Sequence, residues 1–149
     1  MRPVLVGVLA CLFGVSTQAQ VPPTPTGSVR DGVYVIEQAQ RGATLYAKYC
    51  ATCHADDLLG GVHPKSVDRI RVVPALRGGE FIAKYTKMRL GDLFVRTRTS
   101  MPQDSPGSLS RSQNADILAF LLQMNGYPPG DNELRQNDDA WQNAILIEP

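Results

Sequence analysis

Residues 50 to 54 of the chain read Cys50-Ala51-Thr52-Cys53-His54. Two cysteines three positions apart lie on one side of a helical turn, and a histidine follows the second one directly. Both sulfurs can therefore reach the two vinyl groups along one edge of a haem, while the imidazole reaches the iron from the same side. This Cys-x-x-Cys-His spacing is typical of covalent haem attachment. We predict that Cys50 and Cys53 bind one haem c and that His54 is an axial ligand of its iron.

Two other kinds of site use cysteines at this spacing. A thioredoxin-like redox pair also reads Cys-x-x-Cys, but the sequence lacks the βαβ pattern expected beside it. A zinc site would need two more ligands, and His63 is the one further imidazole or thiol after residue 19. The sequence therefore favours haem attachment over both.

The first residues are typical of a secretory signal peptide. Arg2 supplies a positive charge, an apolar run covers residues 4–15, and residues 17–19 (Thr-Gln-Ala) form a small-residue cleavage site. The run is shorter than the ~20 residues of a transmembrane helix, so we expect cleavage after Ala19 and no membrane anchor. In an alternative interpretation, Cys11 is a lipid-modified N-terminus. Export predicts a periplasmic location.

Length and charge limit the class of protein. A chain of 149 residues favours one domain. Its 15 basic and 14 acidic side chains nearly cancel, which argues against nucleic acid as a partner. The charge is uneven, however, because residues 65–98 carry nine basic and three acidic side chains, whereas residues 100–149 carry two and seven. This is either an ordinary solvated surface or a dipole that orients the protein on a redox partner.

Two segments have the pattern of packed helices. In residues 36–49, apolar or small side chains recur at steps of three and four, which predicts a helix with one apolar face. Further along, Ser110 and Gln113 form a capping box, an apolar run follows, and Asn125-Gly126 ends it. We expect the second helix to end near Asn125.

Together with the haem motif, these two helices resemble those of the small monohaem class I cytochromes c. In that family an N-terminal helix leads into the motif and a C-terminal helix packs across it. The resemblance implies an all-α fold of four to five helices around one covalently bound haem. It also implies that Ile117 and Phe120 meet Gly42 and Tyr46 where the two helices cross.

The same resemblance implies two further residues at the proximal side of the haem. Pro74-Ala75-Leu76 matches the element in which a proline carbonyl accepts a hydrogen bond from the ligand histidine. Such a bond fixes the ring and makes the ligand more basic. Leu76 is expected to pack on the haem, and an insertion of about residues 62–72 separates this element from the motif.

A methionine in the second half should be the sixth iron ligand. Met101 is the candidate, because it follows an expected helix over residues 91–97 and the proline after it keeps it extended. Met124 is expected in the core, and Met88 stands among charged residues. His63 is another possible ligand. Histidine–methionine ligation raises the reduction potential of a haem.

Six short elements follow one another in the rest of the chain. They are Pro74-Ala75-Leu76, Phe81, Gly91-Asp92-Leu93-Phe94, Met101-Pro102, Pro106-Gly107-Ser108-Leu109-Ser110 and Asn125-Gly126. In this order they resemble the cytochromes, or cytochrome domains, that accompany periplasmic quinoprotein alcohol dehydrogenases. The resemblance covers residues 34–134. It implies an electron acceptor for such a dehydrogenase, with an oxidase or another cytochrome as the next acceptor.

We therefore expect a signal peptide (1–19), a flexible proline-rich leader (20–32), a cytochrome c domain (33–126) and a C-terminal tail (127–149) anchored on the domain by Trp141. The expected function is that of a monomeric electron carrier and not an enzyme. Two alternatives stay open. An iron without Met101 would permit peroxidase-like chemistry or the binding of a diatomic gas. The chain could also be a tightly bound cytochrome subunit of a dehydrogenase complex.

Overall fold

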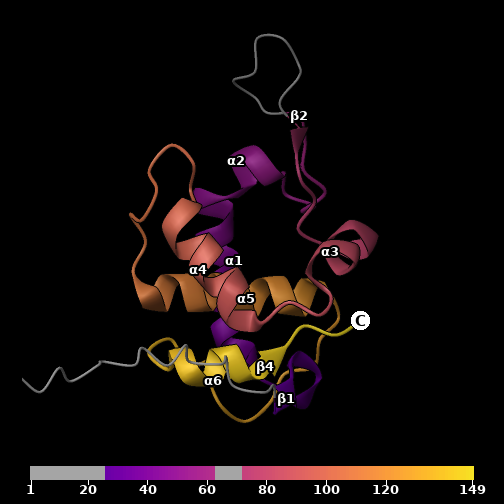
Figure 1. The fold of residues 1–149 in the computed structure, drawn as a ribbon. Coiled ribbons are helices and arrows are strands. Elements are labelled where there is room, and N and C mark those ends of the chain that lie inside the picture. The colour runs from indigo at the N-terminus through magenta and orange to yellow at the C-terminus, as the bar shows by residue number, and fades with distance from the viewer. Residues whose placement is uncertain (1–25, 63–71) are drawn as a thin grey trace, which may run out of the picture.

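The computed structural model describes residues 26–62 and 72–149 (Figure 1). The predicted signal peptide, the first residues of the predicted leader and His63 lie outside the described residues. The helices are α1 (Ile36–Tyr49), α2 (Ala51–His54), α3 (Gly78–Tyr85), α4 (Leu90–Ser100), α5 (Arg111–Met124) and α6 (Asp139–Ala144), with a short 3-10 helix, η1 (Val29–Asp31). The prediction of an all-α fold is confirmed, and α6 in the tail adds a helix to the expected four or five.

The strands are two residues long and form two small pairs. β1 (Gly27–Ser28) pairs in parallel with β4 (Ile145–Leu146). β2 (Gly61–Val62) pairs antiparallel with β3 (Val72–Val73) at the base of the predicted insertion. In Figure 1, β2 lies beside α2 at one end of the molecule, whereas β1, β4 and α6 lie at the other end.

The crossing of α1 and α5 is the central helix contact of the fold. Gly42 is buried against the backbone of Asp116 and the Cβ of Phe120. The ring centroids of Tyr46 and Phe120 are 5.3 Å apart. Ile117 is buried in the same apolar cluster as Tyr46. The predicted meeting of these two helices is therefore confirmed.

The predicted capping box at the start of α5 is present. The Oγ of Ser110 accepts from the Gln113 backbone N–H at 3.2 Å, and the Gln113 side chain accepts from the Ser110 N–H at 2.9 Å. The helix ends at Met124, as its sequence predicts. The prediction that Met124 lies in the core is wrong: its side chain is 36 % exposed, because the buried run of α5 stops at Leu122.

The core consists of two apolar clusters. The larger lies between α3, α4, α5 and the C-terminal tail, and includes Phe81, Leu90, Phe94, Leu118 and Ile147. The smaller lies between α1, α5 and the segment after α2. It consists of Tyr46, Leu58, Leu109, Ile117 and Leu121, with Cys50 and Leu76 packed against it. The haem motif therefore borders the smaller cluster.

The two ends of the described chain are joined to each other and to the core. Residues 27–28 pair with residues 145–146, and Val29 and Ile147 are fully buried. For residues 27–32 the prediction of a flexible leader is wrong, because this backbone pairing and the burial of Val29 hold them in place. Trp141 packs against the larger cluster but is only partly buried. Within the described residues, no helix is both long and apolar enough to cross a membrane.

Candidate haem site

The haem motif occupies the junction between α1 and α2. Cys50 ends α1, with its N–H donating to the Tyr46 carbonyl at 2.8 Å, and at the same time begins α2. The N–H groups of Cys53 and His54 both donate to the Cys50 carbonyl, at 3.1 and 2.9 Å. This single turn places both thiols and the imidazole on one short element, as the spacing predicts.

Residues 55–60 form a tight loop after α2, and its hydrogen bonds hold the haem motif in place against α1. Ala55 and Leu58 both have positive φ, at 61° and 62°, and the Ala55 carbonyl accepts from the Tyr46 hydroxyl at 2.8 Å. The Gly60 N–H donates back to the His54 carbonyl at 3.0 Å. A Cβ on Gly60 would lie 2.2 Å from the Val73 carbonyl oxygen, so this position requires glycine.

His54 is held by the segment that returns from the insertion. Its Nδ1 donates to the Pro74 carbonyl oxygen at 3.0 Å, which leaves Nε2 as the nitrogen able to coordinate iron. Burial lowers the pKa of His54 below its usual value; the hydrogen bond to Pro74 opposes this shift, and the charge of Lys84 adds to it. The imidazole is therefore neutral at neutral pH, which is the form that binds a metal.

The donor set fits a covalently attached haem. Both cysteines are half-buried, and Cys50 packs against the smaller apolar cluster. Burial raises the pKa of the Cys50 thiol to about 11, with a smaller contribution from Cys53. Among the described residues, no three His, Cys, Asp or Glu side chains gather into a metal cluster. Two thiols and one oriented imidazole therefore match the needs of a tethered haem.

A comparison with protein families agrees with this geometry. The model described as "Cytochrome C oxidase, cbb3-type, subunit III" matches residues 37–121, more than half of the chain. The chain belongs to this family of cytochrome c domains. It is a class I monohaem cytochrome c, and its cofactor is one haem c bound covalently at Cys50 and Cys53. The general function of such a cytochrome is electron transfer, and its domains are typically extracytoplasmic.

Two other comparisons complete the picture. A search of curated proteins found no match to this cytochrome. Among solved structures, it is similar to the crystal structure of the sulfane dehydrogenase SoxCD from Paracoccus pantotrophus, with 24 % identity and a TM-score of 0.49. The alignment covers 91 % of this cytochrome and 68 % of that chain.

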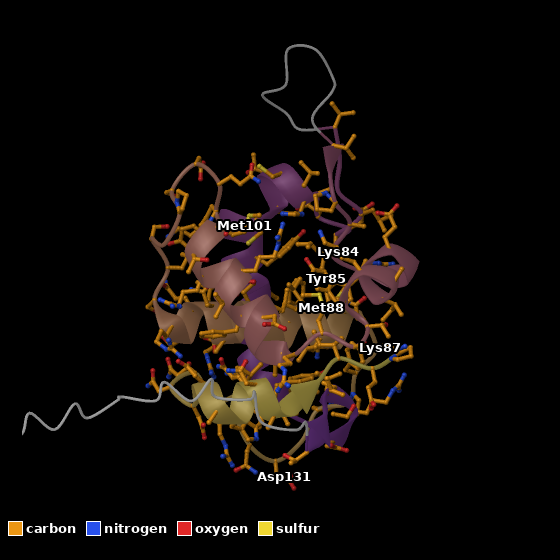
Figure 2. The ribbon with its side chains drawn as sticks, viewed as in Figure 1. Lys84, Tyr85, Lys87, Met88, Met101 and Asp131 are labelled. Atoms are coloured by element: carbon orange, nitrogen blue, oxygen red, sulfur yellow. The ribbon has the colours of Figure 1, made fainter. Side chains whose placement is uncertain are left out.

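Met101 stands directly after α4. Its backbone is extended, with φ −126° and ψ 148°, and its side chain is partly buried. Figure 2 shows it at the end of α4 that is nearer to α2, whereas Met88 lies at the start of α4, on the α3 side. The helix before Met101 is longer than predicted and spans Leu90–Ser100. Its role as iron ligand stays a prediction.

Asn125 is a residue of this cytochrome that sequence reasoning treated only as a helix end. Its Nδ2 donates to the Leu76 carbonyl at 3.0 Å, and its Oδ1 accepts from the Gly78 N–H at 3.0 Å. The Leu76 N–H donates in turn to the Leu58 carbonyl at 2.7 Å. Asn125 thereby fixes the segment whose Pro74 carbonyl holds His54. An asparagine at a helix end gives no signal of such a distant partner.

Proposed function

We propose that this cytochrome is a periplasmic electron carrier with His54 and Met101 as its axial ligands, and that it accepts electrons from a quinoprotein alcohol dehydrogenase. The observation that carries the ligand assignment is the hydrogen bond from the His54 Nδ1 to the Pro74 carbonyl. It occupies Nδ1 as a donor and so leaves Nε2 as the ring nitrogen that can bind iron. Met101, at the end of α4, is the soft donor available for the opposite face.

The surrounding residues favour rapid one-electron exchange. Haem c, when bound, supplies an iron that alternates between Fe(III) and Fe(II). His54 is held in one orientation by Pro74, which also makes its imidazole more basic. The thioether of Met101 favours the reduced state and so raises the potential. Leu58 and Leu76 belong to the apolar cluster that borders the motif, and they limit the access of water on that side.

The proposed donor rests on sequence elements and on charge. The order of short elements from Pro74 to Gly126 resembles the cytochromes that serve quinoprotein alcohol dehydrogenases. Lys84, Lys87 and Arg96 are exposed, so they are available to an acidic partner. Charged encounter surfaces increase the association rate of transient electron-transfer complexes.

The near-red absorption spectrum of the ferric protein tests the ligand assignment, because sulfur-to-iron charge transfer absorbs there only with methionine ligation. We expect this band in the wild type and its loss in Met101→Ala, with Met88→Ala as the control that retains it. If the wild type lacks the band and its ferrous form takes up carbon monoxide, the site is open. The peroxidase-like or gas-binding function then replaces the carrier.

A second experiment tests the donor. Reduction of the purified cytochrome by a quinoprotein alcohol dehydrogenase is followed by stopped-flow absorption, with substrate present and absent. We expect second-order reduction that requires substrate and slows at high salt. Co-purification of the two proteins through high salt would instead make this chain a tightly bound subunit of the dehydrogenase. No reduction would refute this donor while leaving the ligand assignment intact.

A further inference from the structure

The Nε atom of Arg98 is buried and has no hydrogen-bond partner among the described residues. Arg98 precedes Met101, the proposed sixth ligand, by three residues. The side chain is half-buried in α4, three residues before Met101, and its Nε atom is shielded from solvent. No hydrogen bond to this atom is formed in the part of the chain that the structure describes. Buried polar atoms nearly always have a partner, and a shielded cation needs one more than a neutral group does. The Nε of Arg98 therefore indicates an acceptor that is not a residue of the described chain.

The other arginines and lysines of the described chain do not present this problem. Several are held by carboxylates or by a backbone carbonyl: Arg41 by Asp116 and Glu133, Arg111 by Asp139, Arg135 by Asp138, and Arg89 by Asn143. Others, such as Lys84, Lys87 and Arg96, are exposed to water. Among the described residues, the one cationic side chain with a buried, unpartnered nitrogen is thus Arg98.

The position of Arg98 along α4 suggests what the acceptor is. The start of α4 lies against α6, with Gly91 in contact with Asn143, and Met101 at its other end lies nearer to α2 (Figures 1 and 2). Arg98 is three residues, or about 4.5 Å of helix rise, back from Met101 towards α6. A haem tethered through its vinyl edge at α2 carries its two propionates on the opposite edge. In a haem attached in this way, that edge would face away from α2, which is also the direction in which Arg98 lies from Met101.

We infer that the Arg98 guanidinium binds a haem propionate through a charge-assisted hydrogen bond from Nε. A planar guanidinium matches a carboxylate well, and such bonds are stronger than neutral ones. The positive charge offsets the negative charge of the propionate near the iron, which favours the ferrous form and raises the reduction potential. The inference rests on the haem attachment and not on the identity of the sixth ligand or of the electron donor.

A buried water is the competing explanation for the unpartnered Nε of Arg98, because a second buried atom also lacks a partner. The Oδ1 of Asn114 is also buried without a partner, in a side chain that is 0 % exposed and whose Nδ2 already donates to Leu109 and Ser110. A buried water would satisfy such an atom without any haem contact, at Asn114 and at Arg98 alike. We favour the propionate because water leaves the guanidinium charge unpaired.

Nuclear magnetic resonance on the wild-type ferrous holoprotein tests the inference without any variant. With ¹⁵N-labelled arginine, the Hε of Arg98 should exchange slowly and give nuclear Overhauser contacts to the propionate methylene protons; the conservative Arg98→Lys variant assigns the signal. Contacts to water, without contacts to the propionate, would overturn the inference and make a buried water the partner of Arg98.

The midpoint potential and the Raman propionate bending modes give an independent readout. Arg98→Gln should lower the potential and shift a propionate mode, while the near-red band remains. Arg96→Gln is the matched control, because it removes the same charge from an exposed position of the same helix. Equal potential shifts in the two variants, with unchanged propionate modes, would show that Arg98 does not contact the haem carboxylates.

Discussion

Gly42 of α1 lies directly against the backbone of Asp116 of α5, so that a Cβ on Gly42 would stand 1.9 Å from the Asp116 carbonyl oxygen. The neighbouring atom is backbone and cannot rotate away. The close approach also brings Arg41, one residue earlier, within 3.0 Å of the Asp116 carboxylate. The crossing of the two helices therefore depends on the absence of a side chain at one position.

Gly42→Ala should destabilise the protein strongly, although alanine is the better helix former. The added methyl forces α1 and α5 apart, and overpacking of this kind typically costs about 1–3 kcal/mol, occasionally more. Denaturant unfolding of the holoprotein measures the loss. Gly79→Ala in α3 is the control, because a Cβ there has no atom within 4 Å and should leave the stability nearly unchanged. An equal effect of both substitutions would contradict the prediction.

Asn125→Ala should loosen the proximal side of the haem. It removes the hydrogen bonds to Leu76 and Gly78 that hold the Pro74 segment, and each such bond contributes about 0.5–1.5 kcal/mol. We expect lower stability in denaturant and faster replacement of an iron ligand by added imidazole. Asn125→Asp is the intermediate control, since it keeps the acceptor for the Gly78 N–H and loses the donor to the Leu76 and Leu121 carbonyls. A variant with wild-type ligand exchange would show that the segment does not need this support.

How much the sequence predicts depends on how local the cause is. The haem motif and the Ser110–Gln113 capping box are set by neighbouring residues, and the structure forms both as predicted. The pairing of residues 27–28 with residues 145–146 is a two-residue contact between distant parts of the chain, and no local sequence pattern predicts it. Met124 continues the apolar pattern of α5 but lies beyond its buried run, so periodicity alone places it wrongly.

The same reasoning explains the candidate site. Cys50, Cys53 and His54 follow from spacing, and Pro74 follows from a family resemblance that the hydrogen bond to His54 matches. The contacts of Asn125 join residues 47 and 49 positions apart in the chain. The orphaned nitrogen of Arg98 is visible only when its surroundings are known. Contacts of this kind are set by packing, which the sequence pattern does not encode.

Ile147→Ala should destabilise the protein without changing the electronic properties of the haem. Ile147 is fully buried in the larger apolar cluster, and removing such a side chain costs about 2–5 kcal/mol. It belongs to the cluster that does not border the haem motif. Unfolding by denaturant and the midpoint potential are measured together, with the exposed Glu148→Ala as control. A large potential shift in Ile147→Ala would show that the tail affects the haem environment.

Reversing the charge of Lys84 and Lys87 should slow electron exchange with an acidic partner. Both side chains are exposed, and Figure 2 shows Lys84 on α3 and Lys87 just beyond it. The double variant Lys84→Glu/Lys87→Glu should reduce the second-order rate with a quinoprotein alcohol dehydrogenase about tenfold or more at low salt, because electrostatic steering is lost. The difference should shrink at high ionic strength, where charges are screened. Arg30→Glu, exposed on η1 at the opposite end from α2, is the control for net charge, although one reversal changes that charge half as much as the two reversals of the double variant. If it slows the reaction as much as the double variant does, the effect reflects net charge, and α3 is not the docking surface.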